Sequence, residues 1–348
     1  MPNPFLKLLG KEIGFDLGTS NSLVYVKGRG IVVNEPTMVA INRRTNQVVA
    51  VGTEAKKMHG RSPAHIDVIR PLTNGVISDF EMTQEILKYL MAKLNENKIG
   101  FYRGVIGVPT NVTEVERKSV EDVLHGVGIV QVLVVEEPIA AALGAKLPIE
   151  EPGSNMIIDI GGGTSEIAII SMGGIVVAKS LKVAGDRFNQ DILSFIQDEF
   201  KLLIGEPTAE EIKMTIGSAV PLSEKLEMNI RGRDLSTGLP REIIIKDSHI
   251  RSALARSLKV IVEGIREVIE TAPAELVGDI LNRGIYLCGG GGVLRGMDKL
   301  VSGTIGVRSM IVDDPLTTVA RGTGVIIEDW KRYADLLVNP SRPREIKL

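Results

Sequence analysis

The chain has 348 residues, enough for about two domains that each bury a core. Its formal net charge of -2 gives no electrostatic reason to expect a nucleic acid partner, and its single cysteine, Cys288, excludes a disulfide within the chain. No segment approaches the roughly 18 consecutive apolar residues of a membrane span, and the first residues lack the apolar core of a signal peptide, so we expect a cytoplasmic protein.

Strands and helices are predicted to alternate, as in α/β folds. In the first half they are strands at 13–16, 23–26, 30–33, 37–41 and 47–51, a small insertion with few periodic runs up to 79, a helix at 81–95, a strand at 104–108, a helix at 114–125, a strand at 130–135 and a helix from 137. Pro148 and Pro152 predict a linker after this half.

The second half begins with another group of three strands, at 156–159, 167–170 and 174–177. An amphipathic helix is predicted at 186–203, and the spacing of Thr208 and Glu211 predicts a capping box that opens the next helix. A strand pair within 228–246 and a long amphipathic helix at 249–271 follow. The last motif is a strand at 284–288, then Gly289, Gly290, Gly291 and Gly292, then a helix from near Val293.

The two halves begin with nearly the same motif. Asp16-Leu-Gly18-Thr19-Ser20 and Asp159-Ile-Gly161-Gly162-Gly163-Thr164 each end an apolar strand in an aspartate and turn at once through glycine and hydroxyl residues. Such turns can direct backbone N–H groups at an oxyanion. One copy alone is equally typical of an ordinary hairpin turn. Two copies in matching register indicate two related lobes that hold nucleotide phosphates from opposite sides, each with one carboxylate facing Mg²⁺.

Neither common nucleotide signature accounts for these turns. Glu166 stands where the dinucleotide fingerprint needs its last glycine, and no Gly-x-x-x-x-Gly-Lys-Ser/Thr motif occurs. The four glycines from Gly289 allow a ligand to approach the backbone closely at a helix N-terminus. The sequence therefore predicts a phosphate site made from paired hairpins.

Four motifs together resemble the superfamily of actin, sugar kinases and heat-shock ATPases. They are the two hairpin motifs, Glu136-Glu137-Pro-Ile-Ala-Ala-Ala142 and the glycine run that continues to Gly296. The segments 35–40, 75–79, 184–186 and above all 230–240 look more narrowly like the MreB family of bacterial actins, over residues 12–329. The departures are mild: Ser20, Ser165 and Cys288 replace the residues usual at those positions.

The resemblance implies an actin-like fold with a duplicated, ribonuclease H-like core and a central nucleotide cleft. The first lobe would comprise 1–145 and 320–348, with an outer insertion at about 34–79. The second would comprise 146–319, with an outer subdomain at about 185–242. ATP and Mg²⁺ are the implied cofactors.

The resemblance also assigns roles to residues. Asp16 and Asp159 would order Mg²⁺, and Glu137 would orient the attacking water, with Thr164 beside it. The alternative for Glu136 is a solvated helix start. The nucleotide contacts would come from the two turns, from a helix along the ribose and base, and from the glycine run: Gly18, Thr19, Ser20, Gly161, Gly162, Gly163, Glu210, Glu211, Ile212, Lys213, Gly289, Gly290, Gly291 and Gly292.

The function implied by the resemblance is ATP hydrolysis coupled to the turnover of paired homopolymeric filaments. These filaments would lie on the inner face of the cell membrane and direct cell shape through the cell-wall elongation machinery. A plasmid-segregating or organelle-aligning filament remains an alternative, as does a small-molecule kinase, although the chain has little room for the kinases' insertions. A chaperone ATPase would need a further substrate domain.

Two short apolar segments could contact lipid. The first includes Phe5, Leu6 and Leu9, and the second includes Ile99, Phe101 and Tyr102. Packing against the core is the alternative for both segments.

Overall fold

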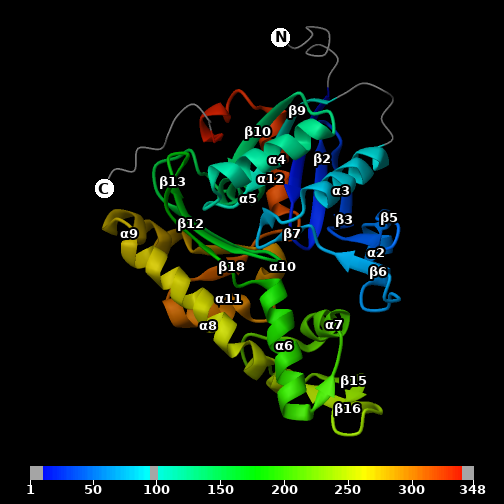
Figure 1. Cartoon of the computed structure of the whole chain (residues 1–348). Helices are drawn as coiled ribbons and strands as arrows, with labels where there is room; N and C mark the ends of the chain where they lie inside the picture. The colour runs from blue at the N-terminus through cyan, green and yellow to red at the C-terminus, as the bar shows by residue number, and fades with distance from the viewer. Residues whose placement is uncertain (1–10, 95–100, 339–348) are drawn as a thin grey trace.

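Two five-stranded sheets of the same topology form the centre of the molecule (Figure 1). The computed structural model describes residues 11–94 and 101–338. The strand orders are β10-β9-β1-β2-β3 and β13-β12-β11-β17-β18. In each sheet the first three strands in sequence pair antiparallel, and two later strands extend the sheet in parallel from the first. The predicted duplication of an α/β core is therefore confirmed.

The first lobe is built on the first sheet and the second lobe on the other. The strands of the first sheet are β1 (Lys11–Leu17), β2 (Asn21–Val26), β3 (Gly30–Pro36), β9 (Phe101–Val108) and β10 (Gln131–Glu136). Those of the second are β11 (Asn155–Ile160), β12 (Ser165–Ser171), β13 (Gly174–Leu181), β17 (Ile285–Cys288) and β18 (Ser309–Ile311).

Helices cover both faces of each sheet. In the first lobe they are α3 (Phe80–Lys93), α4 (Glu114–Gly126), α5 (Glu137–Gly144) and α12 (Thr318–Glu328), with η1 (Ala334–Leu336) near the end of the described chain. In the second lobe they are α8 (Asp247–Thr271), α9 (Ala274–Arg283), α10 (Gly289–Gly292) and α11 (Met297–Ile305). Among the described residues, no helix is long and apolar enough to cross a membrane.

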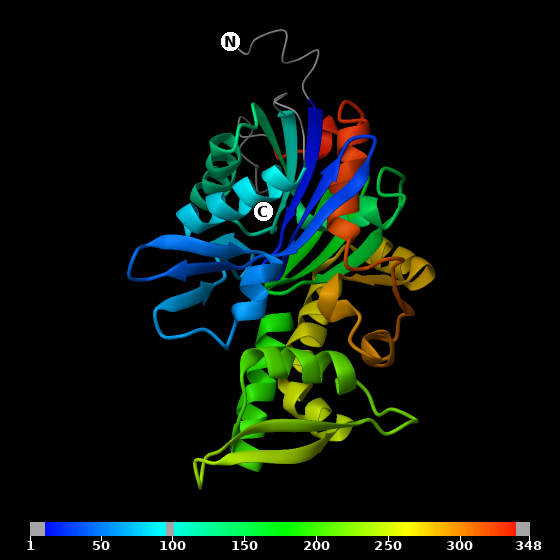
Figure 2. The ribbon, with the colours of Figure 1, turned by 90° about the vertical axis from the view of Figure 1, so that its right-hand side faces the viewer.

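Each lobe carries a smaller outer part. In the first lobe, α2 (Thr53–Met58) packs on a three-stranded sheet of β4 (Val39–Asn42), β5 (Gln47–Val51) and β6 (Ile66–Ile69), followed by the pair β7 (Leu72–Thr73) and β8 (Val76–Ile77). The outer part of the second lobe contains α6 (Gly185–Phe200), α7 (Glu206–Ile216), β14 (Leu202–Leu203), β15 (Glu227–Asp234) and β16 (Pro240–Lys246). Figure 2 shows the β15–β16 hairpin projecting at the end of the molecule.

Strand alternation sets which side chains face the junction of the lobes. Ile13, Phe15 and Leu17 of β1 belong to the core under α3 and α4, so Asp16 lies on the opposite face. Likewise Ile158 and Ile160 of β11 belong to the outer core of the second lobe. Both aspartates are thereby directed to the inner faces of the sheets.

A third core cluster joins the lobes through α5 and α12. It combines residues of both sheets with the alanine-rich helix α5, including Val105 and Ile157. The two helices cross so closely that a Cβ on Gly144 would lie 1.9 Å from the Thr318 carbonyl oxygen, and one on Gly322 would lie 1.7 Å from the Ala140 carbonyl oxygen. Glycine at these positions allows this helix crossing, and the crossing positions the start of α5 between the two sheets.

Three predicted boundaries were wrong. Helix α6 ends at Phe200 because Lys201 adopts a left-handed backbone, and Leu203 belongs to β14. Helix α7 begins at Glu206 after Gly205, so Thr208 lies inside the helix and forms no cap. The four glycines do not form a loop before a helix at Val293; they form the short helix α10 themselves, and α11 begins at Met297.

Candidate functional site

Asp159 is buried and Asp16 is partly buried, and the two lie near each other at the junction of the two sheets. Burial, and secondly the charge of Asp159, raises the pKa of Asp16 to about 7. Burial, and secondly the charge of Glu166, raises the pKa of Asp159 to about 6. Carboxylates in this environment gain from a nearby cation.

Glu137 joins this group from the first turn of α5, where Pro138 follows it. Burial is the main cause that raises the pKa of Glu137 well above its usual value, and the charges of Glu166, Asp159 and Asp16 add to the effect. Its neighbour Glu136 is also buried, with 7% of its surface exposed, so the alternative of a solvated helix start is wrong for Glu136. Carboxylates from both lobes therefore converge at one place.

The two predicted phosphate turns touch each other across the junction. A Cβ on Gly162 would lie 2.2 Å from Ser20 Oγ, and one on Gly163 would lie 2.6 Å from Thr19 Oγ1. Thr19 Oγ1 in turn accepts a hydrogen bond from the backbone N–H of Gly75 at 3.3 Å. Only residues without side chains allow the turns to approach this closely.

Each turn is also held by its own lobe. Thr37 donates from Oγ1 to the Gly18 carbonyl oxygen at 2.7 Å. In the second turn, the backbone N–H of Gly161 donates to the carbonyl oxygen of the buried Thr164 at 2.9 Å. Both turns are thus fixed before any ligand arrives, which is the arrangement that anion-binding turns require.

Glu166 is a member of this site that the sequence did not reveal. It lies opposite Asp159 in the β11–β12 register, and its carboxylate accepts hydrogen bonds from Thr110 N at 3.2 Å, from Thr110 Oγ1 at 2.8 Å and from Ser180 Oγ. Thr110 follows β9 of the first lobe, so Glu166 links the lobes. Its position opposite Asp159 in a hairpin is a signal that register analysis could have used.

The glycine run packs against the end of β11. Gly289 has φ +77°, and a Cβ there would lie 2.3 Å from Asp159 Oδ1. A Cβ on Gly291 would lie 2.3 Å from Ile160 Cγ2. Gly290 differs, because the nearest atom to its Cβ position is Leu316 Cδ2 at 3.6 Å. Packing explains two of these glycines, whereas a Cβ on Gly290 would make only an ordinary van der Waals contact.

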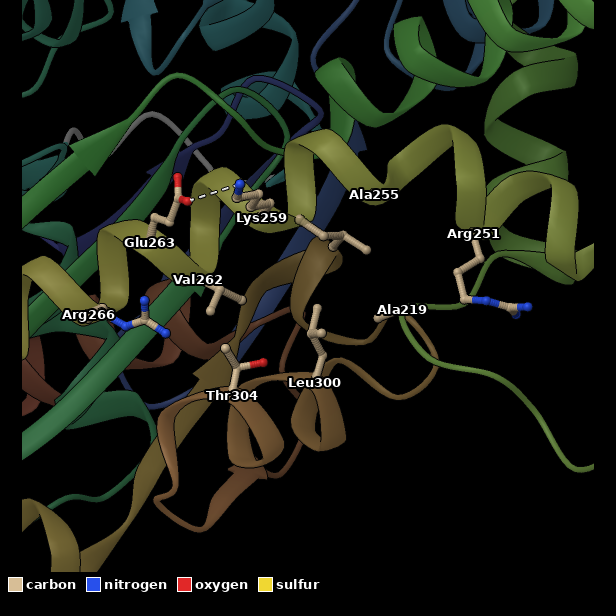
Figure 3. A pocket seen from close by; sticks show the side chains of 10 residues that line it. Ala219, Arg251, Ala255, Lys259, Val262, Glu263, Arg266, Leu300 and Thr304 are labelled. Carbon is tan, nitrogen blue, oxygen red and sulfur yellow. Dashed lines mark ion pairs between the residues drawn. The ribbon is translucent and has the colours of Figure 1, made fainter.

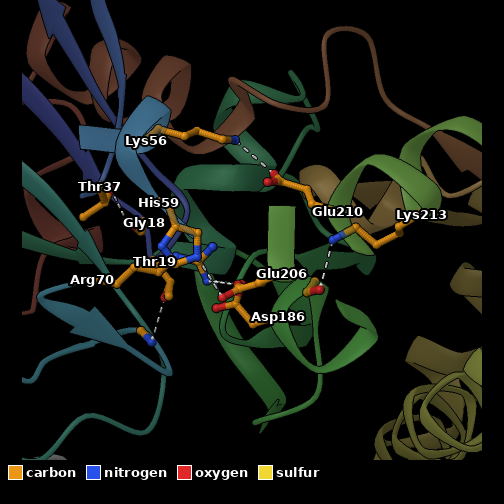
Figure 4. A network of polar contacts seen from close by, with 12 residues as sticks. Gly18, Thr19, Thr37, Lys56, His59, Arg70, Asp186, Glu206, Glu210 and Lys213 are labelled. Carbon is orange, nitrogen blue, oxygen red and sulfur yellow. Dashed lines mark hydrogen bonds and ion pairs between the residues drawn. The ribbon is translucent and has the colours of Figure 1, made fainter. Parts of the chain in front are cut away.

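The four predicted nucleotide contacts on α7 differ from one another in what their side chains contact. Glu210 forms an ion pair with Lys56 of the first lobe at 3.1 Å, and Lys213 donates from Nζ to the Gly185 carbonyl oxygen at 3.0 Å (Figure 4). Glu211 is exposed. The Ile212 side chain is fully buried in the second-lobe core and is not available to a ligand in this conformation.

A network of ion pairs connects the outer parts of the lobes beside these turns (Figure 4). Arg70 Nη1 lies 2.9 Å from Asp186 Oδ1 and 2.9 Å from Glu206 Oε1. His59 Nε2 lies 3.2 Å from Glu206 Oε2. The pKa of Glu206 falls to about 2, chiefly because of its hydrogen bond with His59 and then because of the charge of Arg70. Sequence reasoning noted Asp186 only as part of the family-like segment 184–186 and missed Arg70, His59 and Glu206, because these residues are far apart in the chain.

Two surface pockets lie away from the carboxylates. One of 310 Å³ lies between α8 and α11 and is lined by Leu258, Val262 and Leu300 under a rim that includes Arg251 and Arg266 (Figure 3). The other, of 600 Å³, is formed by the segment that links the lobes and the end of α12. Neither contains a predicted site residue.

The predicted membrane segments mostly lie outside the described residues. This applies to Phe5, Leu6, Leu9 and Ile99. Phe101 and Tyr102 form the start of β9, which establishes their backbone but not the environment of their side chains. Lipid contact by these segments therefore stays a prediction.

Two related α/β lobes, each beginning with an aspartate-ended hairpin and meeting at a shared helix, define an actin-like protein. Solved structures agree with this fold. The chain matches the crystal structure of MreB 5 of Spiroplasma citri bound to AMPPNP with a TM-score of 0.90 and 39% identity, over 94% of this chain and 98% of that chain. It also matches a MamK double helical filament with a TM-score of 0.79 at 22% identity, over 92% and 99% of the two chains, a likeness of fold alone.

The chain belongs to the MreB/Mbl protein family, whose model matches residues 10–335. It is 45% identical to the cell shape-determining protein Mbl of Bacillus subtilis (strain 168) over 93% of this chain and 98% of that protein. It is 42% identical to the cell shape-determining protein MreB of Escherichia coli (strain K12), over 94% and 96% of the two chains. The resemblance inferred from the sequence motifs is therefore confirmed at the level of the family.

Proposed function

We propose that this protein binds and hydrolyses ATP between its two lobes and uses hydrolysis to control its assembly into filaments that direct cell shape. The observation that carries the proposal is the meeting of the two duplicated turns beside Asp16, Asp159 and Glu137. Family membership supports it, as do the solved structures of MreB5 of Spiroplasma citri bound to AMPPNP and to ADP.

The chemistry needs positioning more than covalent help, because phosphoryl transfer to water passes through a loose transition state. The backbone of Gly18 to Ser20 would hold the phosphates from one side and that of Gly161 to Gly163 from the other. Glu137 would orient the attacking water and accept its proton, a role suited to a carboxylate whose pKa is raised. Thr164 lies at the end of the turn from Gly161 to Gly163, and the backbone of Gly289 to Gly292 would lie beneath the adenosine.

The carboxylates fit Mg²⁺. Asp16 and Asp159 repel each other in a buried site, and oxygen ligands are those that Mg²⁺ prefers. Within the described ranges, no cluster of three or more His, Cys, Asp or Glu side chains is arranged to hold a metal. The two aspartates would hold the ion together with phosphate oxygens and water, as is usual for Mg²⁺. When bound, Mg²⁺ supplies charge neutralisation for the phosphates.

The lobe boundaries that the resemblance implies stay a proposal, and we adjust three of them to the ends of the nearest elements. The limit near 242 falls inside β16, so the outer subdomain is better ended at Lys246. The return to the first lobe near 320 falls inside α12, so Thr318 is the better limit. The outer insertion of the first lobe would begin after β3, at Thr37.

Assembly would place the filaments on the inner face of the cell membrane, where they would organise cell-wall synthesis. Each apolar segment offers only a few side chains, at about 1.5–3 kcal/mol for a fully buried large one, so a monomer would bind weakly. A filament repeats the contact many times and turns weak anchors into stable attachment.

Electron microscopy of the purified protein with ATP, Mg²⁺ and lipid vesicles tests the proposal. We expect filaments on the vesicles with ATP. The double variant Leu6→Glu with Phe101→Glu should lose co-sedimentation with vesicles while ATP hydrolysis persists. Absence of filaments with ATP would contradict the assembly role, whereas a double variant that stays on vesicles would contradict only the anchors.

A further inference from the structure

We propose that Arg70, with its partners Asp186 and Glu206, forms a clasp across the two lobes that sets how fast a nucleotide enters and leaves the site between them. The inference rests on the proposed nucleotide site. It goes further by assigning a kinetic role to residues that make no predicted contact with the nucleotide.

The clasp joins segments that are distant in sequence. Arg70 lies between β6 and β7 in the outer part of the first lobe, whereas Asp186 is in the first turn of α6 and Glu206 is the first residue of α7 in the second lobe. A single nitrogen, Arg70 Nη1, lies 2.9 Å from a carboxylate oxygen of each partner. Lys56 of α2 pairs with Glu210, and His59, directly after α2, contacts Glu206.

Partial burial makes these pairs stronger than ordinary surface ion pairs. The side chains of Arg70, Asp186 and Glu206 are exposed by only 20%, 31% and 24%. By contrast, Arg43 and Asp67 pair within the first-lobe outer sheet with exposures of 68% and 35%. Charged hydrogen bonds that are shielded from water contribute more than exposed ones, which often contribute little.

The clasp is connected directly to the second phosphate turn. The backbone N–H groups of Gly185 and Asp186 donate to the carbonyl oxygens of Gly161 and Gly162, at 3.1 and 2.8 Å. Asp186 therefore has two contacts: its backbone N–H holds the turn, and its carboxylate pairs with Arg70. Separation of the outer parts would break the Arg70 pairs and release the residue that supports the turn.

This connection predicts a particular kinetic pattern. A nucleotide held between the turns can leave only when the lobes separate, and the clasp opposes that separation. Because every partner in the clasp is a protein side chain, it would slow entry as well as exit. Loss of the clasp should therefore increase both the association and the dissociation rate constant of the nucleotide and change its affinity little. Damage to the site itself would instead increase only the dissociation rate constant and weaken the affinity.

Stopped-flow measurements with a fluorescent ATP analogue and Mg²⁺, at protein concentrations too low for assembly, test this pattern. Arg70→Ala should raise the association and dissociation rate constants together, by about tenfold each, which corresponds to about 1.4 kcal/mol. Arg70→Lys can keep one ion pair, so its two rate constants should lie between those of Arg70→Ala and the parent. Arg43→Ala removes an exposed pair within one lobe and should match the parent.

A second measurement needs no nucleotide. Spin labels at Val49 on β5 and at Met214 on α7, both exposed in the structure, report the distance between the outer parts of the lobes. Arg70→Ala should lengthen and broaden the distance distribution, and Arg43→Ala should not.

An unchanged distance distribution in Arg70→Ala would contradict the clasp. A change of affinity with an unchanged association rate constant would also contradict it. If the parent protein binds no nucleotide at all, the proposed function fails, while the distance measurement still decides whether Arg70 holds the lobes together.

Discussion

At the scale of single residues, alternation along two strands explains how carboxylates come to face one another. The sequence predicted Asp16 and Asp159 at strand ends, and the structure directs them to the same junction because their neighbours Phe15 and Ile158 enter the outer cores. Glu166 could not be assigned in this way. The hairpin register places Glu166 opposite Asp159, but its contact with Thr110 of the other lobe is not indicated by any local pattern.

Glu137 provides the first test at this scale. Replacement by alanine should keep ATP binding and lower hydrolysis by about 10²-fold or more, a typical loss for a group that acts on the transition state. Steady-state phosphate release and a separate binding titration measure the two effects. Glu136→Gln, one residue earlier, is the matched control and should hydrolyse ATP like the parent. Unchanged turnover in Glu137→Ala would remove Glu137 from the reaction.

At the scale of elements, turn geometry decides which glycines are required. A Cβ on Gly163 would lie 2.9 Å from the backbone N and Cα of Asn74, atoms that cannot rotate away. In contrast, Gly303 lies within α11 and a Cβ there would meet nothing within 4 Å. The position of Gly163 therefore requires glycine, whereas the position of Gly303 has room for a larger residue.

Alanine at these two positions should therefore change stability in opposite directions. Gly163→Ala should destabilise the protein by about 1–3 kcal/mol, as overpacking does, and weaken ATP binding. Gly303→Ala should stabilise it by about 0.5–1 kcal/mol, because alanine favours a helix interior. Urea unfolding measures both. A Gly163→Ala protein as stable as the parent would show that the two turns do not pack as described.

The β15–β16 hairpin provides a pH test that is independent of the nucleotide. The hydrogen bond from Arg241, and then those from the backbone of Thr237 and Ser236, lower the pKa of Asp234 to about 2. An acid whose pKa falls on folding adds stability above its unfolded value, and that stability is lost as the pH falls toward the folded value.

Asp234→Asn should therefore unfold at a lower urea concentration than the parent at pH 7. The difference should be complete above about pH 4 and narrow as the pH falls toward 2, since the parent carboxylate is protonated there. Glu242→Gln, in the exposed pair with Arg231 on the same hairpin, is the control and should show little change. A constant difference between Asp234→Asn and the parent at all pH values would exclude the charge as its cause.

Element boundaries show what the sequence could not predict. The run of four glycines had no hydrophobic period to mark a helix, yet tertiary contacts with Asp159 and Ile160 fold it into α10. The helix α7 begins two residues before Thr208, because Pro207 suits a first turn better than the predicted cap. In the first case packing prevailed over local signals, and in the second one local signal prevailed over another.

At the scale of the whole molecule, the duplicated hairpins were sufficient to predict two related lobes, and the motifs were sufficient to predict the family. The contacts that hold the lobes together were not predictable. Gly144 and Gly322 at the α5–α12 crossing, and Arg70 in the clasp, join segments separated by more than a hundred residues, and their roles depend on the assembled fold.

If the two hairpin turns form one site for ATP and Mg²⁺, calorimetric titration of ATP should detect that site directly. The parent should bind one nucleotide per chain, and its affinity should fall when Mg²⁺ is chelated, since the ion would offset the repulsion between the phosphates and the two aspartates. Asp159→Ala should bind more weakly with Mg²⁺ and respond less to chelation. Equal affinity with and without Mg²⁺ in the parent, or equal titrations for parent and variant, would contradict the shared site.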